Sequence, residues 1–389
     1  MESQSPPRTG TTFLTTCFNG VNALAGFGIL SIPYALSQGG WLSLVLLLTI
    51  ASICSYTGLL LQRCMNVNSL VKTYPDIGEL AFGYKGRFIV AVFMYLELYL
   101  VAVEFLILEG DNLEKLFSKK GKQGFILLAS LIILPTTWLR NLGVFAYVSF
   151  GGALASIIVV GAVLWTAIVG GVDFHKTGDL INWNGIPTAV SIFAFCYSGH
   201  AVFPTIYTSM KEKNMFPRML LVCFSICTLS YVLMGIIGYL MYGQGTLSQI
   251  TLNLPERKLS SKIAIYITLI NPFTKYALVI MPIANAIEDS FQVCNYRIMG
   301  LVIRTLIVIS TVIVALTVPF FGYVLALTGS FLSSTATMLL PCACYLKIFR
   351  GSQRIKFFEL VIITCIIVLG ASIAVMGTYF SLKQIINNL

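Results

Sequence analysis

The sequence predicts an all-α membrane protein that crosses the bilayer eleven times, with its first and sixth helices broken in the middle. Composition is the first observation. Of the 389 residues, 57% are hydrophobic and only 10% are charged, whereas soluble domains carry about 25% charged residues. The second observation is a series of apolar runs close to the roughly 20 residues that span a bilayer. The third is a pair of glycine- and proline-containing interruptions that lie five helices apart.

The predicted helices follow from the positions of these apolar runs and of the polar residues between them. Residues 1–10 are polar and are predicted to be a disordered tail. Residues 74–83 are predicted to form a short helix at the membrane surface. The predicted membrane-spanning segments are 12–36, 42–64, 87–110, 124–139, 143–170, 186–209, 217–242, 260–287, 299–319, 322–346 and 358–381.

The first segment contains several features that oppose a continuous helix. Gly26 and Gly28 flank Phe27, and each glycine costs about 1 kcal/mol relative to alanine in a helix. Pro33 removes a backbone donor, and Asn22 places an amide at membrane depth. In lipid, freed backbone groups persist only where protein or a water-filled cavity satisfies them. We therefore predict a helix broken around a bound solute, with a helix kinked for close packing as the alternative.

The sixth segment has a matching interruption, in which Ser198-Gly199-His200 is followed by Pro204. Paired interruptions at corresponding positions of two halves are the best sequence indication of a secondary-transporter site. Five helices in each half would invert the second half relative to the first. The predicted organisation is a tail at 1–10, a first repeat at 11–170, an inverted second repeat at 184–346 and an eleventh helix at 357–381.

The two breaks together predict a site for a zwitterion such as an amino acid. A half-helix that starts at a break points free N–H groups and a positive dipole end into the cavity, where a carboxylate can bind. Unwound carbonyls on the other side can hold an ammonium group. For His200, a structural role and a role in gating or proton handling both stay open. The predicted substrate-binding residues are Asn22, Ala25, Gly26, Phe27, Gly28, Phe195, Tyr197, Ser198, Gly199 and His200.

Ionisable residues inside the apolar segments are candidates for coupling. Glu97 and Glu104 lie seven residues apart in the third segment and therefore share a helix face. Lys275 lies near the middle of the eighth segment, too deep to reach the membrane surface easily. Charges at that depth are usually functional, and a structural pair between a carboxylate and Lys275 is the alternative. Glu288 and Asp289 are predicted to form a solvated helix end.

Charge and motif content argue against other classes of protein. The net charge of +10 comes from basic residues that lie mostly in short loops, so we expect a lipid bilayer and no nucleic acid as a partner. The ten cysteines lie mostly within apolar segments and predict no disulfide framework. His175 and His200 are the only histidines, and no HExxH, paired-aspartate or nucleophile-elbow pattern occurs. We therefore expect no enzyme, cofactor or metal site.

The distribution of basic residues predicts the orientation. Loops on the side of the N-terminus carry more lysine and arginine than loops on the opposite side, so the N-terminus is predicted to be cytoplasmic. The absence of any Asn-x-Ser/Thr sequon disfavours a glycosylated cell-surface protein. The exception to the charge pattern is a group of four lysines after the third segment, Lys115, Lys119, Lys120 and Lys122.

Several stretches resemble the amino acid/auxin permease family, and within it the vesicular and vacuolar amino acid transporter branch. They are FNGVNALAGFGILSIPYALSQGGW, FCYSGHAVFP, NPFTKYAL, and VPFFGYVLALTGSF with PCACYLKI. The resemblance covers nearly the whole chain and is greatest to plant vacuolar amino acid transporters, partly because of ELYLVAVEFLILEGDNL. It implies a LeuT-like fold of two inverted five-helix repeats plus one helix. It also implies proton-coupled amino acid transport across the membrane of an acidic organelle.

By the same resemblance, sodium-coupled relatives carry a hydroxyl residue where this chain has Lys275, facing a helix-one asparagine that matches Asn22. The hypothesis is that the Lys275 ammonium replaces the sodium ion as a tethered cation. Protonation of Lys275, Glu104 or both would then provide coupling, with Glu97 and Asn22 as further candidates. The expected function is alternating-access transport of neutral amino acids at the vacuolar membrane, by antiport or symport. A plasma-membrane importer and an amino-acid sensor on the same fold are the alternatives.

Overall fold

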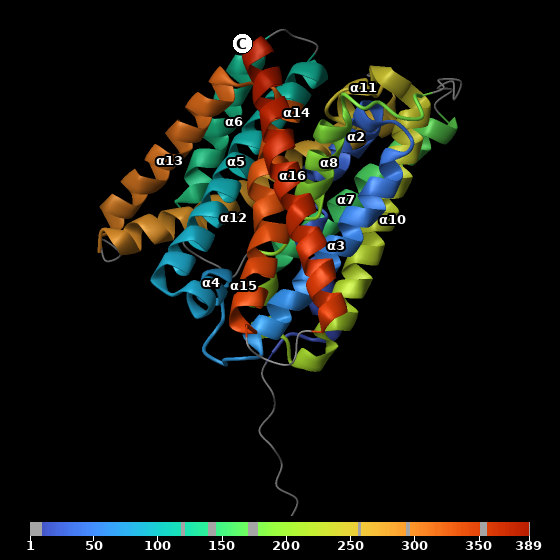
Figure 1. Ribbon diagram of the computed structural model, residues 1–389. Helices are drawn as coiled ribbons and strands as arrows, with labels where there is room; N and C mark the ends of the chain where they lie inside the picture. The colour runs from blue at the N-terminus through green and yellow to red at the C-terminus, as the bar shows by residue number, and fades with distance from the viewer. Residues whose placement is uncertain are drawn as a thin grey trace, which may run out of the picture.

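The computed structural model describes residues 10–117, 121–138, 145–169, 178–255, 258–292, 296–350 and 356–388. These residues form a bundle of helices, most of which run along one common direction (Figure 1). A single isolated bridge pairs Thr11 with Met210, at the end of the second broken helix. Of the predicted tail at 1–10, only Gly10 lies within the described residues.

Helices occupy all eleven predicted segments. The two interrupted segments are divided into α1 (Phe13–Leu24), η1 (Phe27–Ser31) and α2 (Ile32–Gly39), and into α8 (Ile186–Cys196) and α9 (Phe203–Ser209). The tenth segment is α14 (Phe321–Leu327), the π-helical η5 (Thr328–Ser333) and η6 (Thr335–Leu339), and α15 (Leu340–Ile348). The other helices are α3 (Ser43–Met65), α4 (Tyr74–Phe82), α5 (Tyr84–Phe117), α6 (Lys122–Thr137), α7 (Phe145–Val169), α10 (Phe216–Tyr242), α11 (Ile250–Asn253), α12 (Leu259–Ser290), α13 (Arg297–Thr317) and α16 (Phe357–Asn388).

The number of membrane spans is smaller when only length and composition are considered. In the described part of the chain, seven helices are long and apolar enough to cross a membrane, or eight if the bent first pair is one span. Three further apolar helices are shorter than the 18 residues that this criterion requires. The predicted count of eleven spans is therefore not confirmed, although the chain is a multi-pass helical membrane protein.

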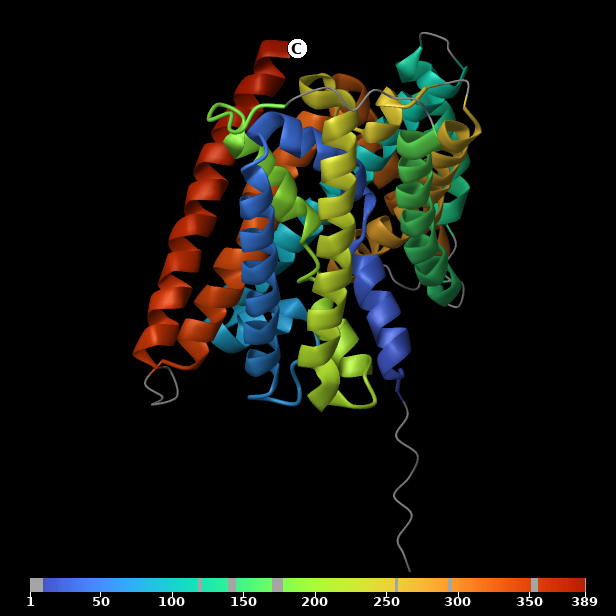
Figure 2. The same cartoon turned by 90° about the vertical axis from the view of Figure 1, so that its right-hand side faces the viewer.

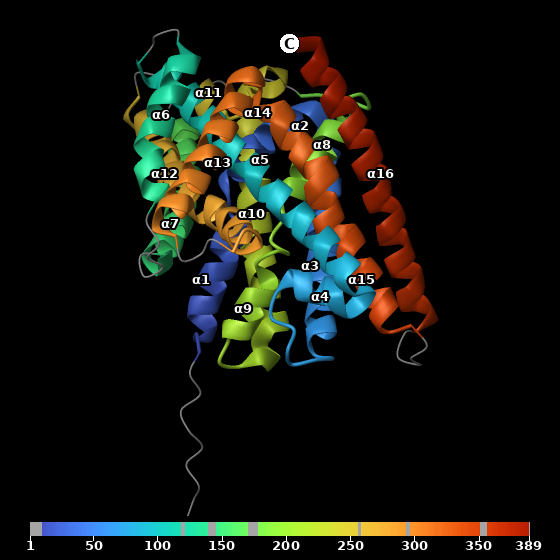
Figure 3. The same ribbon diagram turned by 90° about the vertical axis from the view of Figure 1, so that its left-hand side faces the viewer.

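The two broken helices run in opposite directions. In Figure 3, α1 and α9 lie in the lower half of the molecule, whereas α2 and α8 lie in the upper half. The first helix therefore rises through its break, while the sixth helix descends through its own. An inverted second repeat requires this arrangement, and the repeat boundaries at 11–170 and 184–346 stay a prediction.

The described chain begins and ends at opposite faces of the bundle. In Figure 2, the dark blue α1 starts at the lower face, and the red α16 ends at the upper face, where C is marked. An odd number of crossings produces this arrangement. Which face is cytoplasmic stays a prediction.

The predicted surface helix at 74–83 is present as α4 and is packed against the protein. Thr73 and Asp76 form a capping box at its start, which satisfies backbone donors that the helix leaves open. Tyr74 is buried, and its hydroxyl donates to the Ala336 carbonyl at 2.7 Å. Gly78 approaches α5 so closely that a Cβ on Gly86 would lie 2.1 Å from its carbonyl oxygen.

The prediction that Glu288 forms part of a solvated helix end is wrong. Glu288 is 5% exposed, and its Oε1 accepts a hydrogen bond of 3.2 Å from Arg304 Nε. Arg304 also donates to the Thr137 carbonyl and to Asn285 Oδ1. The partner lies on the next helix, α13, which returns alongside α12, and the local sequence of Glu288 gives no sign of it. Asp289 is exposed, as predicted.

Two of the four lysines that break the charge pattern are held by contacts within the protein. Lys122 pairs with Asp111, and Lys115 Nζ donates to the Leu252 and Leu254 carbonyls at 2.5 and 2.7 Å. The ion pair with Asp111 offsets the charge of Lys122, whereas the two carbonyls hold Lys115 without changing its charge. The other two lysines, at 119 and 120, lie outside the described residues.

Candidate substrate-binding site

The first helix is broken at the predicted position. α1 ends at Leu24, and Gly26 has extended backbone with φ −80° and ψ −169°. A new helix begins at Phe27, bent by 46° from α1. Across the described chain, no backbone carbonyl accepts a hydrogen bond from the Phe27 or Gly28 N–H group. The helix that starts here therefore has free donors and its positive dipole end at the break.

The second break extends over residues 197–202. α8 ends at Cys196 and α9 begins at Phe203. Within the described residues, the His200 and Ala201 N–H groups have no backbone acceptor. The sixth segment is thus also broken, and the break exposes backbone groups near the middle of the bundle.

The two breaks meet at a cavity of about 190 Å³. α5 and α12 supply the rest of its wall, including Glu97, Phe105 and Lys275. Most of the wall is apolar, and the two ionisable side chains are its main charged groups. The predicted residues that line this cavity are Asn22, Gly26, Phe27, Gly28, Phe195, Ser198, Gly199, Glu97 and Lys275.

Two of the predicted substrate-binding residues lie behind this wall. Ala25 is buried, and its carbonyl accepts a hydrogen bond of 3.2 Å from Ser156 Oγ on α7. Tyr197 is fully buried, and its hydroxyl donates to Thr228 Oγ1 at 2.9 Å. Each supports the shape of a break without contacting the cavity.

His200 also lies outside the cavity wall. Its ring is fully buried, and Nε2 lies 2.9 Å from Thr57 Oγ1 on α3. The other ring nitrogen, Nδ1, has no partner in the described residues. The hydroxyl contact with Thr57 ties the second break to α3.

The carboxylates of α5 accept hydrogen bonds from hydroxyl groups that were not among the predicted site residues. Glu97 Oε1 accepts hydrogen bonds of 2.6 Å from Ser198 in the second break and from Ser333 in η5. Glu104 is fully buried outside the cavity, and its Oε1 accepts a bond of 2.6 Å from Thr328 in η5. Its Oε2 has no partner among the described residues. The hydroxyl-rich run TGSFLSSTAT in the tenth segment could have indicated these donors.

Lys275 lines the same cavity as Asn22, as the resemblance implied. In the part of the chain that the structure describes, the Lys275 ammonium makes no ion pair or hydrogen bond. The predicted alternative of a structural pair with a carboxylate is therefore not formed there. Asn22 Oδ1 is buried and likewise lacks a partner among the described residues.

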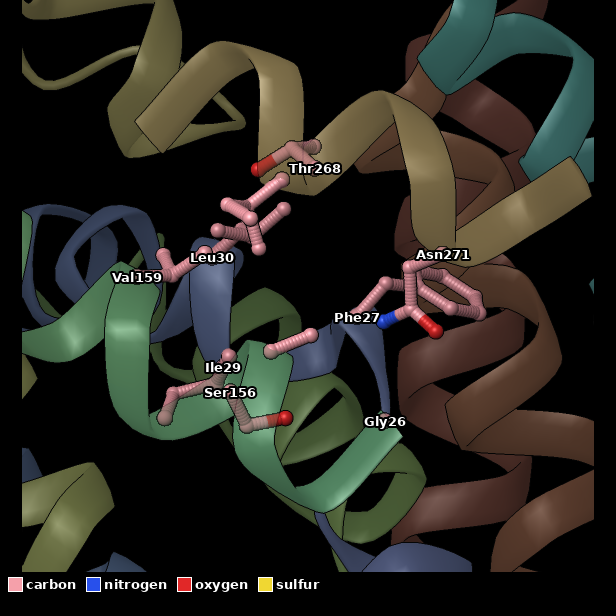
Figure 4. Close-up of a pocket in the computed structure, with 10 residues that line it drawn as sticks. Gly26, Phe27, Ile29, Leu30, Ser156, Val159, Thr268 and Asn271 are labelled. Carbon is pink, nitrogen blue, oxygen red and sulfur yellow. The ribbon is translucent and has the colours of Figure 1, made fainter. Parts of the chain in front are cut away.

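A second, smaller cavity lies on the other side of the first break (Figure 4). Its volume is about 20 Å³, which is room for a single water molecule. Figure 4 shows Ser156 from α7 and Thr268 and Asn271 from α12 around it. Gly26 and Phe27 line both cavities, so the break itself separates them.

A helical membrane protein with two oppositely directed broken helices around a central cavity has the LeuT-like fold. The crystal structure of MhsT in complex with L-phenylalanine matches 95% of this chain and 98% of its own, with a TM-score of 0.60 and 11% identity. The substrate-bound outward-open state of a Na+-coupled sialic acid symporter matches 94% and 89%, with a TM-score of 0.58 and 12% identity. Identities this low establish the fold alone.

The chain belongs to the family described as transmembrane amino acid transporter protein, whose model matches residues 9–383. Amino acid transporter AVT1I of Arabidopsis thaliana is 51% identical over 97% of this chain and 96% of its own. Amino acid transporter AVT1J of the same plant is 49% identical over 97% and 92%. The vesicular GABA transporter of Caenorhabditis elegans is 26% identical over 96% and 80%. The predicted family and branch are confirmed.

Proposed function

We propose that this protein is a secondary active transporter that moves neutral amino acids across a vacuolar or other organellar membrane, coupled to protons by alternating access. The observation that carries the proposal is the central cavity. Both helix breaks open onto it, together with one carboxyl side chain, Glu97, and one amino side chain, Lys275. This combination suits a small zwitterion better than an apolar solute.

The backbone groups at the first break suit the substrate carboxylate. The free N–H groups of Phe27 and Gly28 begin a helix, and such donors bind anions without a basic side chain. The substrate ammonium would be held by unwound carbonyls and by Glu97. Aromatic walls from Phe27, Phe105 and Phe195 favour a neutral side chain over a charged one.

Proton coupling is proposed to pass through Lys275 and the carboxylates of α5. Lys275 lines the cavity, as does Asn22, and its ammonium would serve as a tethered cation in place of a bound sodium ion. Glu97 bonds to Ser198 in the second break, so a change in its protonation alters a contact that shapes the site. Glu104, like Glu97, accepts a hydrogen bond from a hydroxyl group of η5, and it is the second candidate proton carrier.

The organellar location is proposed from the relatives. One of them is named a vesicular GABA transporter, and the resemblance of the sequence is greatest to plant vacuolar transporters. With an acidic lumen, a proton antiporter would fill the organelle and a symporter would empty it.

Reconstitution into proteoliposomes tests the proposal. The purified full chain would be exposed to a pH gradient of each sign, and uptake of each of the common amino acids in tritiated form would be measured. We expect uptake of neutral amino acids under one sign of gradient, abolished by a protonophore and unchanged when choline replaces sodium. Absence of gradient-dependent flux for every amino acid would overturn the proposal, and binding without flux would favour a sensor.

A further inference from the structure

We infer that Tyr231 is a positioning residue that ties the two helix breaks together and thereby sets the width of the substrate site. The Tyr231 hydroxyl, on α10, lies 2.7 Å from the Leu24 carbonyl oxygen and 3.1 Å from the Cys196 carbonyl oxygen. Leu24 is the last residue of α1, and Cys196 is the last residue of α8. The inference rests on the proposed transport function, since it concerns the same cavity.

The two carbonyls need a donor because each stands at the end of a helix. The last carbonyls of a helix have no intrahelical partner, and inside a membrane such groups persist only where protein or a water-filled cavity satisfies them. The Leu24 carbonyl also accepts from the Gly26 N–H at 2.8 Å. The Cys196 carbonyl accepts no backbone hydrogen bond within the described ranges, so it depends on the Tyr231 hydroxyl.

Tyr231 acts from behind the cavity wall. Its side chain is fully buried and does not line the cavity, whereas Leu24 and Cys196 both do. Its ring packs edge-on against Tyr197, with centroids 5.3 Å apart. A change at Tyr231 would therefore reach a bound solute only through the two carbonyls that it holds.

α10 is a firm support for this contact. One turn beyond Tyr231, a Cβ on Gly235 would lie 3.0 Å from Ile32, on the far side of the first break. A Cβ on Gly238 would lie 2.5 Å from Pro33. This close approach holds α10 against the first broken helix, so the hydroxyl is fixed relative to that break.

The contact also bears on alternating access, because α1 and α8 reach the breaks from opposite faces of the molecule (Figure 3). A tyrosine hydroxyl has one proton, and two carbonyls lie within reach of it. When α1 and α8 move relative to each other, the hydroxyl can keep one bond while it releases the other. It thus links the two half-helices while both contacts are made, and it stays attached to one of them when they separate.

Tyr231→Phe tests the inference because it removes one oxygen and keeps the ring. The control is Tyr276→Phe, since Tyr276 is also fully buried and does not line the cavity, and its hydroxyl lies 2.6 Å from Thr311 Oγ1 on α13. The probe is the tritiated amino acid that gives the largest uptake with the wild-type chain. We expect KM to rise about two- to ten-fold in Tyr231→Phe, with wild-type KM in the control.

Hydrogen–deuterium exchange in detergent without substrate provides a second readout. Exchange in peptides covering residues 26–29 and 198–201 should increase in Tyr231→Phe and stay unchanged in Tyr276→Phe. Wild-type KM together with wild-type exchange in a folded Tyr231→Phe protein would overturn the inference. If the wild-type chain transports no amino acid, the proposed function fails instead, and the exchange data still decide whether Tyr231 holds the breaks.

Discussion

Lys275 is the charged residue of the cavity whose side chain makes no ion pair with any described residue. An unpaired ammonium at membrane depth is unfavourable and is retained where it has a function. We expect Lys275→Ala to reduce gradient-driven uptake to the level measured without a pH gradient, because the tethered cation is lost. Exchange of internal for external substrate should persist, since the cavity wall remains.

Lys262→Ala is the matched control for Lys275→Ala. Lys262 is exposed on the same helix, α12, and its replacement should leave gradient-driven uptake unchanged. If uptake by Lys275→Ala depended on the pH gradient as uptake by the wild-type chain does, the hypothesis of a tethered cation would be wrong. Coupling would then have to be assigned to the carboxylates of α5.

Gly26 provides a test of substrate size. A Cβ at Gly26 would meet no heavy atom within 4 Å, so alanine fits without a clash and places a methyl group at the cavity wall. We expect Gly26→Ala to lower uptake of large neutral amino acids relative to small ones by about ten-fold or more. Competition between labelled alanine and unlabelled leucine measures this ratio.

Gly124→Ala controls for the loss of glycine itself. Gly124 lies on α6, where an added Cβ also meets no atom within 4 Å. Gly26 has extended backbone and Gly124 is helical, but alanine at either position reduces the backbone freedom of the unfolded chain. A shared rise in thermal stability is therefore expected. An unchanged substrate ratio in Gly26→Ala, with only expression altered, would favour a packing role for the glycine.

Among the elements, α13 is attached to the bundle by a buried cation. Arg304 donates to Glu288 and Asn285 on α12 and to the Thr137 carbonyl on α6. We expect Arg304→Ala to destabilise the fold by about 3–5 kcal/mol, because it removes the cationic partner of the buried Glu288 carboxylate. Thermal unfolding in detergent measures the effect as a lower Tm.

Arg297→Ala is the control for this substitution. Arg297 is exposed at the start of the same helix, and a surface change of this kind alters stability by less than about 0.5 kcal/mol. An equal loss of Tm in the two variants would mean that the ion pair with Glu288 is not what attaches α13.

The position of the tenth segment was predicted from the sequence, but its π-helical conformation was not. Its apolar length identified residues 322–346, but the π-helical windings of η5 and η6 depend on contacts with other helices. The hydroxyls of Thr328 and Ser333 reach Glu104 and Glu97 on α5. π-Helical turns often occur at functional sites, and here they supply donors to both candidate proton carriers.

For the whole molecule, the position of the two ends is a direct test of topology. The described chain starts and finishes at opposite faces of the bundle (Figure 2). We expect tags fused to the two ends to lie on opposite sides of the membrane in sealed vesicles. With the predicted orientation, a protease added from the cytoplasmic side would remove the N-terminal tag and spare the C-terminal one. Removal of both tags from the same side would exclude an odd number of crossings.

Much of the fold was predictable because the bilayer restricts the backbone conformations that can span it. Backbone groups in lipid must be satisfied within helices, so apolar length alone located every segment from 12–36 to 358–381. Glycine and proline identified both breaks because their effects on the backbone are local. The cavity lining was predicted in large part because residues at a break face the space that the break opens.

Contacts between distant segments could not be predicted, and these decide how the site is held. The sequence alone was enough to predict a multi-pass helical membrane protein with two broken helices, and ionisable residues at membrane depth at Glu97 and Lys275. The packing of the helices was needed to show that Lys275 lines the cavity without an ion pair to any described residue, that Ser198 donates to Glu97, and that Tyr231 contacts both breaks. The reason is physical: local sequence sets where a helix must break, whereas the partner of a buried polar group depends on which helices pack beside it.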